Sequence, residues 1–208
     1  MKTMIKYQYQ IENRGETFVN KIIGKIQYNA PVILNFTLLS FISYILGQFT
    51  KNFTTTLIFS NYKTSFADPM QYVRLFSHIL GHANWAHFAG NFIIILIIGP
   101  MLEEKYGSKT LVQMILITAL VTGLIHTLFS NTILLGASGV VYMFIILSSF
   151  ANTEAGKIPL TLIIVFIIFV GREIFSGVTA QDNISQVSHI IGGICGVFFA
   201  FRKSRRDS

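Results

Sequence analysis

The chain has 208 residues, of which 52% are hydrophobic and 12% are charged. Soluble domains carry about 25% charged residues, so this composition excludes an ordinary soluble domain and favours an all-α polytopic membrane protein. The net charge of +7 would suit nucleic-acid binding, but the basic residues gather at the two ends of the chain and leave its middle nearly bare. We therefore expect a lipid bilayer, and no nucleic acid, among its partners.

Residues 1–30 form a basic N-terminal segment that we expect to lie in the cytoplasm. Within it Phe18, Ile22, Ile23 and Ile26 recur at near-helical spacing, beside two lysines. This pattern is typical of an interfacial helix on an anionic membrane surface. It fits a basic tail equally well, so both interpretations stay open.

Six apolar stretches follow, and each predicts a transmembrane helix. They cover residues 31–50, 86–102, 110–129, 136–150, 158–170 and 186–201. The first is uncharged and, at about 1.5 Å per residue, long enough for about 30 Å of hydrocarbon. Residues 51–85 form a connection so long that we expect it to be functional or to carry structure of its own. The six spans make one domain over residues 31–201, and residues 202–208 form a basic cytoplasmic tail.

The basic residues also predict the orientation of the spans. With both ends of the chain inside, the inner segments hold twelve lysines and arginines and the outer segments hold four. This bias follows the positive-inside rule, and an even number of spans returns both termini to the cytoplasm. The second, fourth and sixth spans then all run from outside to inside. Near their starts lie His87, Ser138 and His189, which we therefore expect at one depth.

The fourth span is short. Its 15 residues, 136–150, reach only about 22 Å as a helix, less than the hydrocarbon core of about 30 Å. We expect this helix to begin below the outer surface, with residues 130–135 dipping in to meet it beside protein or a water-filled cavity. Ser138 at a recessed helix N-terminus suits a hydrolase, because the unpaired N–H groups and the helix dipole favour a developing oxyanion.

A serine nucleophile needs a base, and His189 is the candidate, because ionisable residues inside a span are functional by default. Tyr142 lies one turn after Ser138, where its ring could stack on the imidazole. Asp and Glu are absent from the second, fourth and sixth spans, so a Ser–His dyad is predicted rather than a triad. Small residues would let the fourth and sixth spans approach closely, although such packing alone is common in membrane helices. These residues are Gly136, Ala137, Gly139, Gly192 and Gly196.

His87 and Asn91 lie four residues apart, so they share a helix face. Both could donate hydrogen bonds to an oxyanion, together with the Ser138 backbone N–H. A metal site formed by His78, His82 and His87 is the alternative. It lacks an HExxH-type glutamate, and no thiol or carboxylate partner lies close in sequence, so neither a metal nor another cofactor is predicted.

The other histidines and the single cysteine are expected to be structural. We interpret His78 and His82 as hydrogen-bonded residues of the long connection. His126 stands alone in the third span and is interpreted as a packing residue. Cys195 is interpreted as an inert small apolar residue, and as the single cysteine it excludes an internal disulfide.

Jointly, these motifs resemble the rhomboid family of intramembrane serine proteases. They come in the family's order and cover roughly residues 31–201. One departure is Val73, where many members carry tryptophan before the arginine. The matching residues are Arg74, His78, His82, His87 and Asn91; Glu103 and Gly107; Gly136, Ser138, Gly139 and Tyr142; and His189, Gly192 and Gly196.

The resemblance implies a six-helix rhomboid-like bundle that cleaves single-pass membrane proteins in or next to their transmembrane segments. Substrates would enter past residues 158–185. The implied roles are Ser138 as nucleophile, His189 as general base and acid, His87, Asn91 and the Ser138 backbone as oxyanion hole, Tyr142 as support for His189, and Arg74 and Glu103 as structural residues.

Two other functions stay open from the sequence. The first is a catalytically silent relative that binds membrane helices. The second is a transporter, against which the lack of carboxylates in the second, fourth and sixth spans counts. In each case we expect a multi-pass protein of the cell membrane, and a single-domain chain of this kind suits a bacterial plasma membrane.

Overall fold

A computed structural model describes residue 25 and residues 27–65, 67–150, 157–165, 167–168 and 183–207. Within these residues the chain is almost wholly helical, and extended pairing is limited to one antiparallel bridge between Asn61 and Leu134. The helices are α2 (Pro31–Phe49), α3 (Phe53–Leu57), α4 (Pro69–Ser77), the 3-10 helix η1 (His78–Leu80), α5 (Trp85–Tyr106), α6 (Ser108–Phe129), α7 (Ser138–Ser149) and α9 (Asn183–Asp207).

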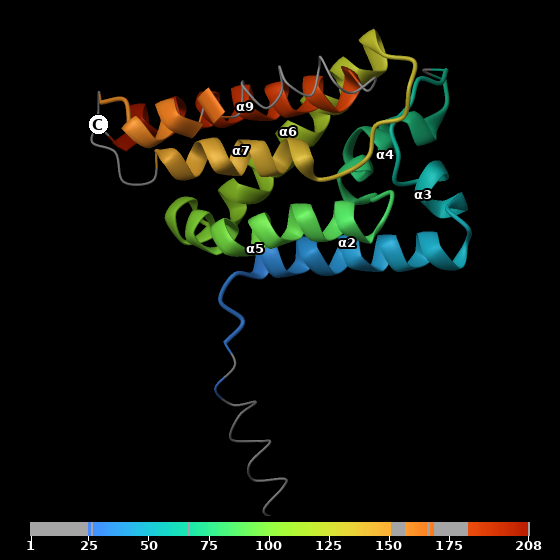
Figure 1. Ribbon diagram of the computed structural model, residues 1–208, viewed down its shortest axis with the longest axis horizontal. Coiled ribbons are helices and arrows are strands. Elements are labelled where there is room, and N and C mark those ends of the chain that lie inside the picture. Colours follow the sequence, from blue (N-terminus) through green and yellow to red (C-terminus); the bar gives the residue numbers. More distant parts are fainter. Residues whose placement is uncertain are drawn as a thin grey trace, which may run out of the picture.

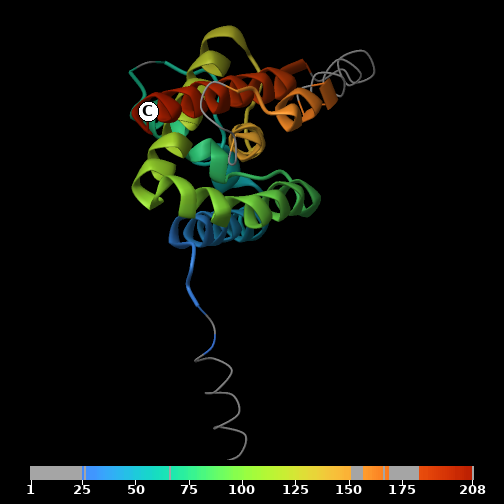
Figure 2. The same cartoon turned by 90° about the vertical axis from the view of Figure 1, so that its left-hand side faces the viewer.

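Four of these helices form a stack. In Figure 1, α9 lies above α7, α7 above α5, and α5 above α2. The view turned by 90° keeps this order and looks along α7, which lies between α9 and α5 (Figure 2). The short α7 is therefore covered from both sides, which suits a helix whose residues are mostly buried.

Helices α2 and α5 run antiparallel, and their boundaries follow from local chemistry. Pro31 occupies the first turn of α2, where its missing N–H breaks no helical bond. The Asn84 side chain caps α5 by accepting a hydrogen bond from the His87 N–H. Gly107, with a φ of +79°, ends α5 and leads directly into α6.

Glu103, close to the end of α5, ties three helix ends together. Its carboxylate accepts hydrogen bonds from the N–H groups of Val32 at 3.0 Å and Ile33 at 3.1 Å. It also accepts a 2.7 Å bond from the Ser108 hydroxyl, at the start of α6. The first N–H groups of α2 have no partner within their own helix, so the carboxylate satisfies them and gains from the helix dipole.

The long connection between α2 and α5 carries α3, α4 and η1, so the expected structure is present. Arg74 is buried on α4, and its guanidinium donates 2.8 Å bonds to Asp68 and Thr64. It also lies over the Tyr62 ring, 4.4 Å from the centroid. Asp68 in turn caps α4 through the Met70 N–H. The connection is held as a folded unit by these bonds.

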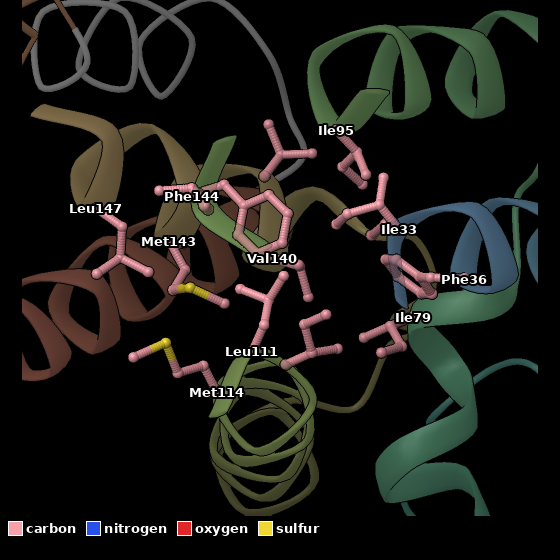
Figure 3. Packing of buried hydrophobic residues seen from close by; sticks show 14 of the residues in the cluster. Ile33, Phe36, Ile79, Ile95, Leu111, Met114, Val140, Met143, Phe144 and Leu147 are labelled. Atoms are coloured by element: carbon pink, nitrogen blue, oxygen red, sulfur yellow. The ribbon is translucent and has the colours of Figure 1, made fainter. Parts of the chain in front are cut away.

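The core forms where α7 meets its neighbours. Figure 3 shows Val140, Met143 and Phe144 of α7 pointing toward side chains of α2, α5, α6 and η1. Val140, Met143 and Phe144 are fully buried. Because interiors are close-packed, a cavity there is costly, and Phe144→Ala is expected to destabilise the fold by about 3–5 kcal/mol.

The predicted spans agree with the helices to different degrees. Helices α2, α5 and α6 are long and apolar enough to cross a membrane, whereas α7 and residues 186–202 of α9 are shorter apolar helices. Of the fifth span, residues 160–165 and 167–168 are helical and the rest lies outside the described residues. The all-α membrane class is therefore confirmed, and the count of six spans is supported only in part.

Several boundaries differ from the prediction. Helix α7 begins at Ser138 instead of residue 136, because Gly136 has a φ of +117° that a helix does not allow. Helix α9 begins at Asn183 and continues to Asp207, so the predicted basic tail prolongs the helix. The apolar stripe of residues 18–26 lies outside the described residues.

Candidate active site

A cavity of about 720 Å³ is lined by residues of α5, α7 and α9, by Leu134 and Leu135 before α7, and by Val165 and Ile168 of the fifth predicted span. Its wall contains apolar side chains such as Leu135, Val141 and Ile168, together with a small set of polar ones. Such a mixture is usual for ligand-binding sites. The polar side chains of this wall are those that the sequence singled out, namely His87, Asn91, Ser138, Tyr142 and His189. Three helices thus bring to one cavity residues that lie far apart in the chain.

Ser138 is the first residue of α7 and is half-buried in the cavity wall. The preceding turn depends on Gly136, whose positive φ strongly favours glycine. A Cβ at Gly136 would lie 2.6 Å from His87 Nε2, so a side chain there would also displace the imidazole. The Gly136 N–H donates a 2.9 Å bond to the His78 carbonyl, which ties the turn to η1.

His189 is brought to the cavity by close packing of α7 against α9. A Cβ at Gly192 would overlap the Gly139 carbonyl, and one at Gly196 would lie 2.8 Å from the Met143 carbonyl. Glycine at both positions lets the two backbones approach, as small residues do in membrane helices. The Tyr142 and His189 rings then lie 4.4 Å apart, tilted by 37°. The expected contact between these two rings is present.

Asn91 is held by a hydrogen-bond chain that the sequence did not reveal. Its side-chain amide bonds the Nε2 atom of His82 at 3.1 Å, and the Ala137 N–H donates to the same nitrogen at 3.4 Å. The other ring nitrogen, Nδ1, contacts the Leu80 carbonyl at 3.2 Å, which assigns the proton to Nδ1. Burial lowers the pKa of His82 to about 3, so the ring is neutral and accepts at Nε2.

Two other histidines hold backbone segments. The Nε2 atom of His78 bonds the Ala119 carbonyl at 3.1 Å, which fastens η1 to α6. The Nε2 atom of His126 bonds the Thr132 carbonyl at 2.8 Å, and Thr132 lies in the link that leads to α7. The interpretation of His126 as a packing residue thus missed its hydrogen bond. Within the described ranges no three side chains of His, Cys, Asp or Glu are grouped to hold a metal ion.

The segment before α7 is also anchored by Asn61. Its backbone exchanges two 2.8 Å hydrogen bonds with Leu134, whose side chain lines the cavity. Its side-chain amide, fully buried, donates to the Gly123 carbonyl at 2.8 Å and to Thr127 Oγ1 at 3.0 Å. One asparagine therefore joins the long connection, α6 and the cavity wall. A single asparagine in a polar loop carries no spacing that would have marked it.

Comparison with known proteins identifies the family of this fold. A family model described as Rhomboid domain matches residues 69–206, which include every helix around the cavity. The chain belongs to the rhomboid family. With its long apolar helices, this rhomboid is an integral membrane protein.

Curated relatives of this rhomboid are distant in sequence. Rhomboid protease GlpG of Serratia proteamaculans is 26% identical over 179 residues, which cover 84% of this chain and 63% of that protein. Rhomboid protease GluP of Bacillus subtilis is 27% identical over 206 residues, 96% of this chain and 38% of that protein. Rhomboid-related protein 1 of Caenorhabditis elegans is 30% identical over 139 residues.

This rhomboid spans 63% of the Serratia protein and 38% of the Bacillus protein. Two of these three relatives bear the name protease. The Serratia and Bacillus relatives are bacterial, which supports a plasma-membrane location for the chain.

Proposed function

We propose that the chain is an intramembrane serine endopeptidase, with Ser138 as nucleophile and His189 as general base and acid. The observation that carries this proposal is the single cavity that Ser138 and His189 line together with His87 and Asn91. A hydrolase needs a nucleophile, a base and oxyanion donors around one space. The residues proposed for these roles come from α5, α7 and α9. The family membership supports the same assignment.

The proposed reaction is acyl transfer in two halves. Ser138 Oγ attacks the scissile carbonyl carbon while His189 takes the hydroxyl proton, giving a tetrahedral intermediate. When it collapses, the C–N bond breaks and the imidazolium gives its proton to the leaving amine. Water then attacks the acyl-enzyme with His189 again as base, which releases the new carboxyl group and restores Ser138.

The oxyanion of each intermediate would be stabilised from two directions. The N–H of Ser138 belongs to the first turn of α7, where N–H groups lack partners within their own helix and the dipole is positive. His87 and Asn91 face the same cavity from α5. Because His82 and Leu80 hold one side of the Asn91 amide, its orientation is set before a substrate arrives.

The proposed substrates are single-pass transmembrane proteins, reached from within the bilayer. Apolar residues of the cavity wall, such as Ile145 and Val165, suit a segment that comes from a membrane. A substrate helix already satisfies its own backbone hydrogen bonds, so it must unwind locally before Ser138 reaches a carbonyl. Entry past residues 158–185 and cytoplasmic termini belong to the proposal, and most of that entry segment lies outside the described residues.

Mutation of the serine tests the proposal directly. In proteoliposomes with a test transmembrane substrate, we expect Ser138→Ala to lower the cleavage rate by about 10³-fold or more. The matched control is Ser148→Ala on the same helix, because Ser148 lies outside the cavity and bonds the Ile145 carbonyl. Cleavage by Ser138→Ala at the rate of the control would refute the assignment.

A catalytically silent helix-binding protein is the competing function, and covalent labelling separates the two. A fluorophosphonate probe is expected to label the unmodified chain and not Ser138→Ala. A serine that reacts with neither the probe nor a substrate, in a chain that still binds transmembrane helices, would favour the silent protein.

A further inference from the structure

A second cavity, of about 640 Å³, is separate from the candidate active site. It runs between α2 and α6 and is lined almost wholly by apolar side chains, among them Leu39, Phe76, Val112 and Leu116. We call it the α2–α6 groove. It shares no residue with the cavity that holds Ser138. Its walls are α2 and α6, which are long enough to span a membrane, together with residues of α4 and η1, so we place it at hydrocarbon depth.

The groove begins at one membrane face. Its lining starts at Pro31 of α2 and Ser108 of α6, the first residues of these helices. Glu103 binds the starts of both helices, so they lie at the same level. On the orientation predicted from the basic residues, this level is the cytoplasmic interface.

The groove ends about halfway through the membrane. Its lining reaches Leu39 on α2 and Leu116 on α6, eight residues from either helix start, which is about 12 Å. At that end η1 and α4, which also line the groove, lie across α6: His78 bonds the Ala119 carbonyl, and a Cβ at Gly123 would lie 2.9 Å from the Leu75 carbonyl. One leaflet of a bilayer has about 15 Å of hydrocarbon. The groove therefore fits the length of one leaflet.

Asn35 adds a polar group inside the groove. It lies on α2 one turn beyond Pro31, about 6 Å along the helix, and its side chain is exposed. No side chain or backbone group in the described ranges hydrogen-bonds to its amide. An unpaired amide facing lipid is unfavourable in a transmembrane span. The ester carbonyl of a glycerophospholipid is an acceptor found at this depth.

A basic residue, Lys109, follows Ser108, which lines the mouth of the groove. Lys109 is exposed in the first turn of α6, one turn before Val112 and on nearly the same face as Leu116. The uncapped N-terminus of α6 adds a positive field there. The carboxylate of Glu103 stands behind this mouth, but three hydrogen bonds from Val32, Ile33 and Ser108 compensate it.

We propose that the α2–α6 groove binds one acyl chain of an anionic glycerophospholipid, with its ester at Asn35 and its phosphate at Lys109. A transmembrane protein helix fits less well, because it must continue across the whole bilayer whereas the groove is closed at half depth. The proposal concerns a lipid site and does not depend on the proposed protease activity.

Lipid binding to the purified full chain tests this proposal. Phosphatidylglycerol and phosphatidylcholine with identical acyl chains are titrated separately into detergent-solubilised protein, and bound lipid is counted by native mass spectrometry. We expect Leu116→Trp, which fills the groove, to weaken phosphatidylglycerol binding at least tenfold. The matched control is Ile117→Trp, because Ile117 is equally exposed on α6 but does not line the groove. It is expected to change binding less than twofold.

Two further variants test the polar contacts. Lys109→Gln is expected to weaken binding of phosphatidylglycerol about fivefold and that of phosphatidylcholine much less. Asn35→Leu is expected to weaken both lipids alike, since both carry the ester. Equal effects of Leu116→Trp and Ile117→Trp would show only a general lipid coat and overturn the site. Equal affinity for the two lipids in the unmodified chain would overturn the anionic headgroup.

Discussion

Two groups of polar residues differ in how many of their hydrogen bonds are made within the protein. The loop network, which we define as Asn61, Gln71 and Arg74 with their partners, uses its side-chain amides and most of its guanidinium. In the candidate active site no described residue hydrogen-bonds to the hydroxyl of Ser138 or the ring of His87. Polar groups whose hydrogen bonds are all made within the protein hold a structure together, whereas a hydroxyl and a ring without protein partners stay available to a substrate. Mutations should therefore affect stability in the first group and rate in the second.

Of the substitutions that test this difference, Asn91→Ala is expected to have the largest effect, a loss of catalytic rate. Removal of one oxyanion donor typically costs 10²–10³ in rate, so Asn91→Ala is expected to lower kcat by about 10²-fold or more. Cleavage kinetics in proteoliposomes measure the rate, and a thermal melt of the same sample reports the folded fraction. A rate loss that merely follows a loss of folded protein would place Asn91 with the loop network instead.

Gly192→Ala tests the spacing between α7 and α9. The added Cβ overlaps the Gly139 carbonyl, and a backbone atom cannot move aside as a flexible side chain can. The helices must separate, and a shift of about 1 Å at a catalytic group can cost 10²-fold in rate. We expect kcat to fall by about that factor, measured against Ile194→Ala on the exposed side of α9. Activity equal to that control would mean that the α7–α9 spacing is not limiting.

Asn61→Ala should give the opposite outcome, a loss of stability without a loss of rate. The substitution removes the bonds to Gly123 and Thr127 and leaves Gln71 Nε2 without its Asn61 acceptor. We expect the free energy of unfolding to fall by about 2 kcal/mol, because buried groups lose their partners. The backbone bridge to Leu134 survives, so kcat per folded molecule should stay within twofold. Asn131→Ala, at an exposed position, is the control.

The smallest expected effect is the pH dependence of Asp68. The hydrogen bond from the Met70 N–H, followed by that from Arg74, holds the pKa of this carboxyl below its ordinary value of 3.8. Its ionised form therefore contributes stability that is complete above about pH 3.8 and is lost as pH falls through the lower folded-state pKa. The Tm difference between the unmodified chain and Asp68→Asn should shrink below that pH. A difference independent of pH would contradict this account.

Much of the fold was predictable because membrane spans are read from length and apolarity alone. The boundaries of α2 and α6 were found within two residues for that reason. The start of α7 was missed by two residues, since a glycine at positive φ leaves no mark in hydropathy. The helical extension of α9 into the basic tail was missed because charge was taken to end the helix.

The sequence predicted which residues line the candidate site, but not which residues hold them in place. His87, Ser138 and His189 stand at the starts of three parallel spans, so chain direction alone brought them to one level. The bonds from His82 to Asn91 and from Asn61 to Leu134 join segments whose pairing depends on how the long connection folds back. No periodicity in the sequence encodes that folding, so these two residues could be found only in three dimensions.

The hydrogen bonds of Glu103 fix the axial position of α5 relative to α2 and α6. At its lower end the carboxylate locks α5 to the first turn of α2 and to Ser108. His87 lies sixteen residues, about 24 Å, further up the same helix. A slip of α5 by one turn would move His87 by about 5.4 Å relative to the other residues of the cavity wall. The position of His87 in the cavity wall is therefore set by contacts at the other end of α5, a helix long enough to span a membrane.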